Sequence, residues 1–265
     1  MTPTPAASTL TVSAAGGPVP VTFTERGAGR PVLLLHGGAG PQSVEQFGAM
    51  LADHARVIVP VHPGFGGTPR PAALDSMAGL AAVYGQLIDD LGLDGVTVIG
   101  NSVGGWIAAE LALLGNPRVS GVVLVDAAGL QLADAPAADF FSLTMDQVAD
   151  LAYFRPDDFR IDVAALPEPA RAAMAGNQAD LKVYGGPAMA DAGLLARLPA
   201  ITVPVLVVWG AADRMIPPAH GQAYAAAIPG AALRVITEAG HLPQLETPGQ
   251  LLEIITEFAG APAGG

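Results

Sequence analysis

A serine between two glycines stands where a predicted strand gives way to a predicted helix. Val96–Ile99 is a short, mostly β-branched run typical of a buried strand, and a helical spacing of apolar residues begins at Ile107. Gly100 and Gly104 lie two residues on either side of Ser102, where a side chain would obstruct a sharp turn. The sequence therefore predicts a strand, a tight turn and a helix, with the Ser102 hydroxyl exposed at the carboxyl end of the strand.

This arrangement is that of a nucleophile elbow, in which a strained turn presents a reactive serine. The helix that follows the turn also offers the backbone N–H of Val103 to an oxyanion that develops beside Ser102. A plain glycine-rich turn between a strand and a helix has the same short pattern. The pattern alone therefore leaves a catalytic and a purely structural turn open.

Composition limits the class of protein and of partner. The chain has 265 residues, 51% of them hydrophobic, and no apolar run reaches the ~18 residues of a membrane span. It has no cysteine, which excludes disulfides, a thiol nucleophile and thiolate metal ligands. The net charge is −12 and the basic residues form no cluster, so we expect neither nucleic acid nor an anionic membrane as a partner. Residues 1–8 lack a basic segment followed by an apolar stretch, so we expect no secretion signal and a cytoplasmic protein.

Strand-like and helical segments alternate through the first half of the chain. Buried-type strands are predicted at Val32–Leu35, Arg56–Val61, Val96–Ile99 and Val119–Val125, and amphipathic helices between them at 44–51, 77–91 and 107–114. This alternation predicts an α/β fold, a mostly parallel sheet with helices on both faces. Two earlier stretches, Thr9–Ser13 and Val19–Glu25, predict an antiparallel hairpin at one edge of the sheet.

The alternation stops from about Ala127 to Pro199. This stretch has proline- and acid-rich turns between short helical patterns such as Phe140–Leu151, and it contains no strand-like apolar run. We therefore expect a helical insertion, here called the cap, after the sixth strand and over the carboxyl edge of the sheet.

The strand and helix pattern returns after the insertion. Strands are predicted at Val203–Trp209 and Leu233–Thr237, and helices at Pro218–Ile228 and Pro248–Phe258. The expected organisation is a single domain over residues 1–265, with a core of 8–128 and 199–260 and a cap of approximately 129–198.

Three polar residues follow predicted strands and suit one reaction. Serine is a poor nucleophile unless a base lies beside it, and a histidine base needs an acid to fix its tautomer. Ser102, Asp213 and His241 each follow a strand, and the carboxyl ends of parallel strands share one edge of a sheet. Ser102 is therefore a candidate nucleophile, His241 a candidate base and Asp213 a candidate acid.

Other polar residues compete for these roles. Asp126 also follows a strand and is an alternative acid; its other interpretation is a cap for the segment that enters the insertion. His36 and His62 follow strands, and we interpret them as tying loops together or lining the pocket. His54, at a helix end, and His220, inside a helical pattern, are interpreted as structural. The scattered histidines predict no metal site, and we expect no cofactor because no phosphate-binding or dinucleotide motif is present.

Taken together, the motifs resemble the α/β-hydrolase superfamily with a cap, over roughly residues 20–260. The matching segments are the elbow Gly100–Gly104, His36–Gly38, Pro63–Gly66, Gly210–Asp213, and Gly240–His241 followed by Glu246–Pro248. The resemblance implies the α/β-hydrolase fold, a Ser102–Asp213–His241 triad, and an oxyanion hole from the backbone N–H groups of Gly38 and Val103. Many members have an aspartate where this chain has Val61 and His62, a departure that concerns loop packing more than chemistry.

The resemblance implies a serine hydrolase that acts through an acyl-serine intermediate, with a small carboxylic ester as the expected substrate and water as the second one. Carbon–carbon bond hydrolysis of a diketone-type substrate is an alternative, because residues 100–105 and 36–41 resemble those enzymes. Against it, those enzymes usually carry a tryptophan soon after the histidine, where this chain has Leu242–Leu245. A non-catalytic ligand receptor on the same fold is a further alternative, and the oligomeric state is left open.

Overall fold

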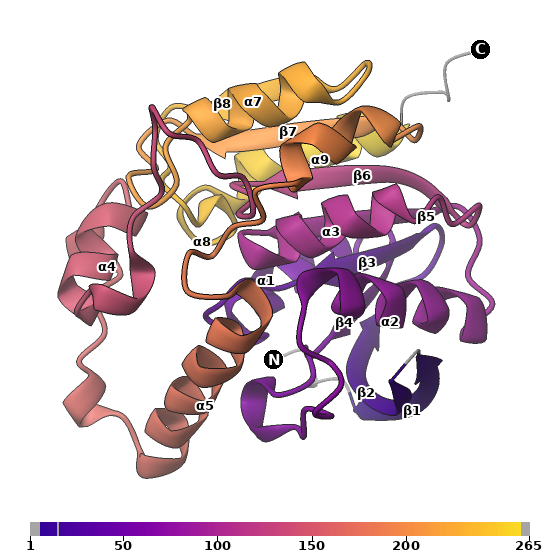
Figure 1. Ribbon diagram of the computed structural model, residues 1–265, viewed down its shortest axis with the longest axis horizontal. Helices are drawn as coiled ribbons and strands as arrows, with labels where there is room; N and C mark the ends of the chain where they lie inside the picture. The colour runs from indigo at the N-terminus through magenta and orange to yellow at the C-terminus, as the bar shows by residue number, and fades with distance from the viewer. Residues whose placement is uncertain (1–5, 15, 261–265) are drawn as a thin grey trace.

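The computed structural model describes residues 6–14 and 16–260 and has an eight-stranded sheet at its centre (Figure 1). The strands are β1 (Ala7–Ala14), β2 (Gly17–Arg26), β3 (Pro31–Leu35), β4 (Arg56–Pro60), β5 (Val96–Asn101), β6 (Val119–Val125), β7 (Val205–Gly210) and β8 (Ala232–Ile236). Their order across the sheet is β1-β2-β4-β3-β5-β6-β7-β8. Part of the segment 1–8, for which the sequence predicts no secretion signal, lies outside the described residues.

The pairing of the strands confirms the predicted mostly parallel sheet. β3 pairs in parallel with β4 and β5, and β5, β6, β7 and β8 follow one another in parallel. β1 and β2 form an antiparallel hairpin, and β2 pairs antiparallel with β4. The hairpin therefore lies at one edge of the sheet, as the sequence predicts, and the carboxyl ends of β3 to β8 share one edge.

Helices cover both faces of the sheet because successive strand residues point to opposite sides. Leu33 and Leu35 of β3 lie in one apolar core, and Val32 and Leu34 lie in the other. The first core includes residues of α2 (Met77–Asp90), α3 (Val103–Leu113) and α7 (Ala219–Ala227). The second includes residues of α1 (Gln42–Leu51) and α9 (Pro248–Gly260). The sheet is thus buried on both faces. A functional site is therefore expected among the loops at its carboxyl edge.

The cap comprises the chain between β6 and β7, and it stands beside one end of the sheet (Figure 1). Its helices are α4 (Met145–Ala152), α5 (Glu168–Gly185) and the single turn α6 (Leu194–Arg197). The helical pattern predicted at Phe140–Leu151 forms two separate pieces, because a 3-10 helix at Phe140–Ser142 precedes α4 and the two do not merge. Thr144 separates them: its side chain accepts the N–H of Gln147, and the Gln147 side chain accepts the Thr144 N–H.

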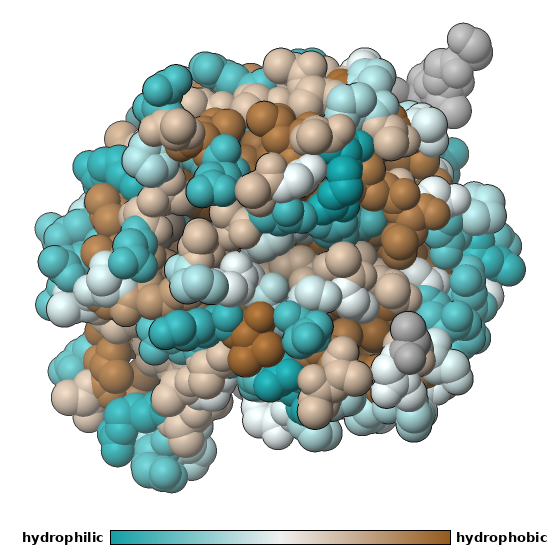
Figure 2. Space-filling view, viewed as in Figure 1, coloured by the Kyte–Doolittle hydropathy of each residue, from teal (hydrophilic) through white to brown (hydrophobic). Residues whose placement is uncertain are grey.

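The surface of the face in Figure 2 mixes hydrophilic and hydrophobic residues over the sheet helices and the cap. Its brown patches are separated by teal and white residues, so this face presents no broad contiguous apolar patch. Within residues 6–14 and 16–260, no helix combines the length and the apolar character needed to cross a membrane.

Candidate active site

Ser102 occupies a strained turn between β5 and α3. Its backbone has φ 55° and ψ −118°, a conformation that side-chain-bearing residues rarely adopt. A Cβ atom on Gly100 would collide with the carbonyl group of Gly104, and one on Gly104 would collide with the carbonyls of Leu35 and His36. The two glycines are therefore required by backbone contact, as the sequence predicts, and the turn presents the serine at the sheet edge.

The structure brings Ser102, His241 and Asp213 together in one hydrogen-bonded chain. Nε2 of His241 lies 2.9 Å from Oγ of Ser102, and Nδ1 of His241 lies 2.7 Å from Oδ2 of Asp213. An ionised carboxylate can only accept, so Nδ1 carries the imidazole hydrogen and Nε2 is the acceptor for the serine hydroxyl. This is the tautomer that a histidine needs in order to remove the proton from serine.

Asp213 is fixed from a second side by its own turn. Its Oδ1 accepts the backbone N–H groups of Met215 and Ile216, each at 2.8 Å. With the His241 contact, the carboxyl group has three N–H donors and is almost fully buried. The turn after β7 therefore orients Asp213 without help from solvent.

Asp126, the alternative acid, lies at the end of β6 beside these residues. It is fully buried with φ 45°, and its Oδ1 accepts the N–H of Gly210 at 2.8 Å. The expected capping role is wrong, because the carboxyl group binds the neighbouring strand β7 and not the segment that enters the cap. Burial and the nearby charge of Asp213 raise the pKa of Asp126 well above its usual value.

Asp126, Asp213 and His241 are also close enough to be considered as metal ligands, with one ligand atom of each within 4.8 Å of the others. Both oxygens of Asp213 already accept N–H groups, and Nδ1 of His241 is used in one of those contacts. A cation would have to break these hydrogen bonds, so the donor set suits a hydrogen-bonded acid and base.

The loop after β3, which contains Gly38, lies against the elbow. A Cβ atom built on Gly37 would be 3.0 Å from Oδ1 of Asn101 and 3.3 Å from Cβ of Ser102. A side chain on Gly37 would be crowded by both residues, so the loop and the serine approach closely because this position is a glycine. Val103, as the first residue of α3, has an N–H without a preceding helical turn to bind it.

Two buried histidines tie this loop to the loop after β4. Nδ1 of His36 lies 2.8 Å from the Gly37 carbonyl, and its Nε2 accepts the N–H of His62 at 3.1 Å. Nε2 of His62 lies 2.9 Å from the His36 carbonyl, and its Nδ1 lies 2.5 Å from the Tyr84 hydroxyl. Each ring is therefore a neutral tautomer with both nitrogens paired, which favours the loop-tying interpretation of the two. Burial lowers the pKa of His62 to about 4.

The model of the alpha/beta hydrolase family matches residues 32–254, most of the chain and all of the loops described above. The chain belongs to the alpha/beta hydrolase family. Its sheet, its helices on both faces and its elbow are those of a hydrolase.

Several known enzymes are similar to this chain over almost its whole length. The 2-hydroxy-6-oxo-6-(2'-aminophenyl)hexa-2,4-dienoic acid hydrolase of Metapseudomonas resinovorans is 29% identical, over 92% of this chain and 88% of its own. A thermophilic esterase from Thermogutta terrifontis is 25% identical, with a TM-score of 0.77 over 96% of this chain and 97% of its own. Est816, described as an N-acyl homoserine lactone degrading enzyme, is 27% identical, with a TM-score of 0.76 over 94% and 100%.

Helix α5 of the cap packs on the loops of the hydrolase core. The Tyr184 hydroxyl donates to the Pro63 carbonyl at 2.9 Å, and Oδ1 of Asn177 accepts the N–H of Gly66 at 2.8 Å. Cδ2 of Leu181 lies 3.0 Å from the position of a Cβ built on Gly38. An apolar side chain therefore borders the loop that carries Gly38.

The end of α4 is joined to the loops that carry His241 and Asp213. The N–H of His241 donates to the Ala152 carbonyl at 2.6 Å, and the N–H of Arg214 donates to the Leu151 carbonyl at 3.0 Å. A helix end leaves its last carbonyls without partners inside the helix, so these loops complete α4. The position of His241 is therefore coupled to the cap.

Glu246, at the end of α8 (Pro243–Glu246), strengthens this junction. Its Oε2 accepts the N–H of Gly240 at 2.6 Å, and its Oε1 accepts the N–H of Phe154 at 2.7 Å. The sequence identifies Glu246 only as part of a motif after the histidine. The spacing of apolar residues does not predict that Glu246 contacts Phe154. This role was missed because it depends on where the cap lies.

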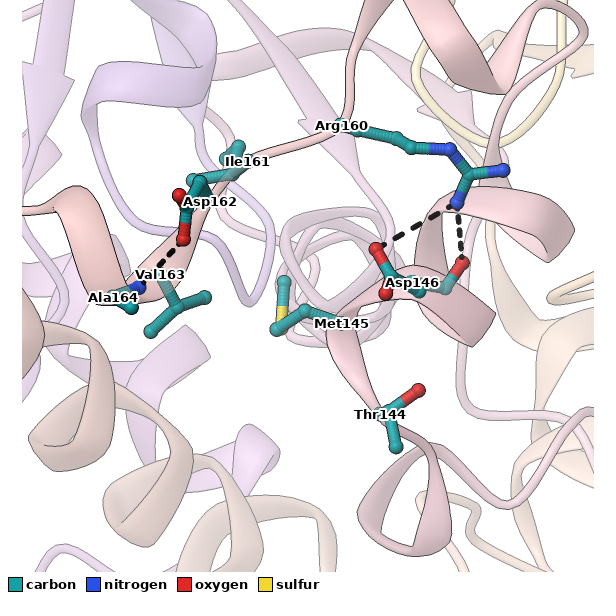
Figure 3. A pocket seen from close by; sticks show the side chains of 8 residues that line it. All are labelled: Thr144, Met145, Asp146, Arg160, Ile161, Asp162, Val163 and Ala164. Atoms are coloured by element: carbon teal, nitrogen blue, oxygen red, sulfur yellow. Dashed lines mark hydrogen bonds and ion pairs between the residues drawn. The ribbon is translucent and has the colours of Figure 1, made fainter.

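A separate cavity of about 400 Å³ lies within the cap (Figure 3). It is lined by Thr144, Met145, Asp146, Arg160, Ile161, Asp162, Val163 and Ala164. Arg160 turns toward α4, where it pairs with Asp150 at 2.6 Å and lies 3.7 Å from Asp146. All of these residues belong to the cap, and none comes from the loops of Ser102, Asp213 or His241.

Proposed function

We propose that this hydrolase cleaves small carboxylic esters through an acyl-serine intermediate, with Ser102, His241 and Asp213 as its catalytic triad. The observation that carries the proposal is the continuous contact from Oδ2 of Asp213 through both ring nitrogens of His241 to Oγ of Ser102. Hydroxyl activation of this kind serves acyl transfer.

The first half of the reaction forms the acyl-serine. Oγ of Ser102 attacks the ester carbonyl carbon while its proton passes to Nε2 of His241. Asp213 stabilises the imidazolium, and the N–H groups of Val103 and Gly38 bind the negative oxygen of the tetrahedral intermediate. The bond to the alcohol oxygen then breaks, and that oxygen takes the proton from Nε2.

The second half uses water in place of the alcohol. Nε2 of His241 removes a proton from water as its oxygen attacks the acyl carbon. The bond to Oγ of Ser102 then breaks, Oγ recovers its proton from Nε2, and the carboxylic acid leaves.

Two observations support an uncharged ester as the substrate. Leu181 is buried and borders Gly38, so an acyl group beside the proposed oxyanion hole meets hydrocarbon. Two of the structural relatives named above are an esterase and an enzyme described as degrading an N-acyl homoserine lactone, whose ring contains an ester bond.

Carbon–carbon bond hydrolysis is the second candidate, supported by the 29% identity to the dienoic acid hydrolase of Metapseudomonas resinovorans. The asparagine of the shared Gly-Asn-Ser pattern has a structural task here. Nδ2 of Asn101 donates to the His241 carbonyl at 3.0 Å, and its Oδ1 accepts from Gln244 at 3.1 Å. This residue holds the histidine loop whichever bond is cleaved, so it does not favour the carbon–carbon reaction.

The test compares the two substrate classes on one preparation. Short p-nitrophenyl esters and a 2-hydroxy-6-oxo-dienoate are offered separately, and the purified chain is also treated with a fluorophosphonate and digested for mass spectrometry. We expect ester turnover, with the label on the peptide that contains Ser102. Faster turnover of the dienoate would support the second candidate. The absence of both turnover and label would support a ligand receptor.

A further inference from the structure

Asp126 is a buried carboxyl group for which the proposed reaction has no task. Its Oδ1 accepts one N–H, from Gly210, while its Oδ2 has no hydrogen-bond partner among the residues that the structure describes. A fully buried ionised oxygen without a donor costs far more free energy than a neutral carboxylic acid in the same place, because burial removes the hydration of a whole charge. The orphaned oxygen therefore raises the question of which carboxyl group at this edge bears the charge.

The hydrogen bonds answer that question. One oxygen of Asp126 lies within 4.8 Å of a carboxylate oxygen of Asp213 and of a ring nitrogen of His241. Two carboxyl groups so close in a buried site favour a state with a single negative charge. Asp213 has three N–H donors and Asp126 has one, so the charge resides on Asp213.

We propose that Asp126 is held as the neutral carboxylic acid and is a positioning residue for the triad. Through Oδ1 it fixes Gly210, the last residue of β7 before the turn of Asp213, and it adds no second charge beside His241. The catalytic consequence rests on the proposed function, whereas the charge state does not.

The surroundings of Asp126 agree with a neutral group. The titratable groups that face it are Asp213 after β7, His241 after β8 and Glu246 on α8. Burial raises the pKa of Asp126 most, followed by the charge of Asp213, with a smaller contribution from Glu246.

The stability of the folded chain tests the charge state without turnover. An unfolded aspartate loses its proton near pH ~3.9, while the folded Asp126 keeps it, so the wild type loses stability as the pH rises above that value. Asp126→Asn preserves the shape and the Oδ1 acceptor but has no proton to lose. We expect the ratio of the wild-type to the variant unfolding constant to rise by about tenfold per pH unit. Asp53→Asn, at an exposed carboxyl group, is the matched control for the loss of one charge.

A ratio that is independent of pH between about 5 and 8, or that falls as the pH rises, would overturn the proposal. If Asp126→Asn does not fold, carbon NMR of the wild type with labelled aspartate carboxyl groups decides the point. One aspartate should keep the chemical shift of the protonated acid at neutral pH, and its absence would contradict the inference. Neither experiment measures hydrolysis, so a failure here is distinct from a failure of the ester reaction.

Discussion

Oγ of Ser102 lies 2.9 Å from Nε2 of His241, although 139 positions separate the two residues in the chain. The sheet brings the two residues close together, because β5 and β8 end at the same edge. The cap also fixes the position of His241, since the Ala152 carbonyl accepts the N–H of His241 at 2.6 Å. The histidine is therefore held between the core and the cap.

The acid of the proposed triad is tested by comparing two aspartates. We expect Asp213→Asn to lower kcat by about 10⁴, with little change in KM, because the amide favours the wrong tautomer of His241. Asp126→Asn should lower kcat by no more than about tenfold, since it replaces a neutral acid with a neutral amide. Both substitutions are nearly isosteric, so steady-state kinetics on one ester gives a clean comparison. A mild effect at Asp213 with a severe one at Asp126 would reverse the assignment.

The junction between the cap and the histidine loop is tested at Glu246. Glu246→Ala leaves the N–H groups of Gly240 and Phe154 without their acceptor, so we expect it to lower the free energy of unfolding by about 1–3 kcal/mol. A displaced His241 should also lower kcat by about 10- to 100-fold.

The exposed Glu253 on α9 offers the matched control. Glu253→Ala also removes a glutamate carboxylate, but at a position outside the junction. Glu246→Gln keeps one acceptor oxygen and should recover part of the lost kcat. If Glu246→Ala changes stability alone and leaves kcat intact, the junction is structural only.

The buried histidine pair predicts a loss of stability in acid. The pKa of His62 is lowered from 6.5 to about 4 by burial, so its neutral form stabilises the fold above pH 6.5. As the pH falls toward 4, His62 of the unfolded chain binds a proton while the buried His62 of the folded chain stays neutral, so unfolding is increasingly favoured. The free energy of unfolding should fall by about 3 kcal/mol over this range.

Denaturant titrations of the wild type and His62→Asn, from pH 7 to 4, measure this contribution. Between pH 7 and pH 4 the free energy of unfolding should fall less in the variant than in the wild type, whatever the variant's stability at neutral pH. Equal losses in the two proteins would mean that His62 is not the group that titrates. The exposed His54, replaced in the same way, is the control.

Much of the fold was open to prediction because it rests on local patterns. The runs Val32–Leu35 and Val119–Val125 are apolar on both faces, which is typical of strands in a covered parallel sheet, and each is a central strand. The elbow was predictable for a steric reason, since Gly100 and Gly104 meet backbone atoms where a Cβ would stand.

The remaining features depend on contacts between distant segments. The apolar residues of helix α5 are mostly alanines, and the helix buries Asn177, Leu181 and Tyr184 against loops that lie far away in the chain. The sequence predicts Asp126 as an alternative acid or as a cap, because a carboxyl group after a strand can bind the next backbone N–H groups. Its actual partner, Gly210, is a neighbour only once β6 and β7 are paired.

The central claim is that Ser102 is the nucleophile, and the turnover of a short p-nitrophenyl ester by Ser102→Ala tests it most directly. The hydroxyl adds little to the packing of the elbow, so the variant should fold with an unchanged circular dichroism spectrum. We expect kcat/KM to fall by about 10⁴ or more, leaving only the effects of binding and of the oxyanion hole. Retention of a tenth or more of the wild-type turnover would contradict the serine mechanism.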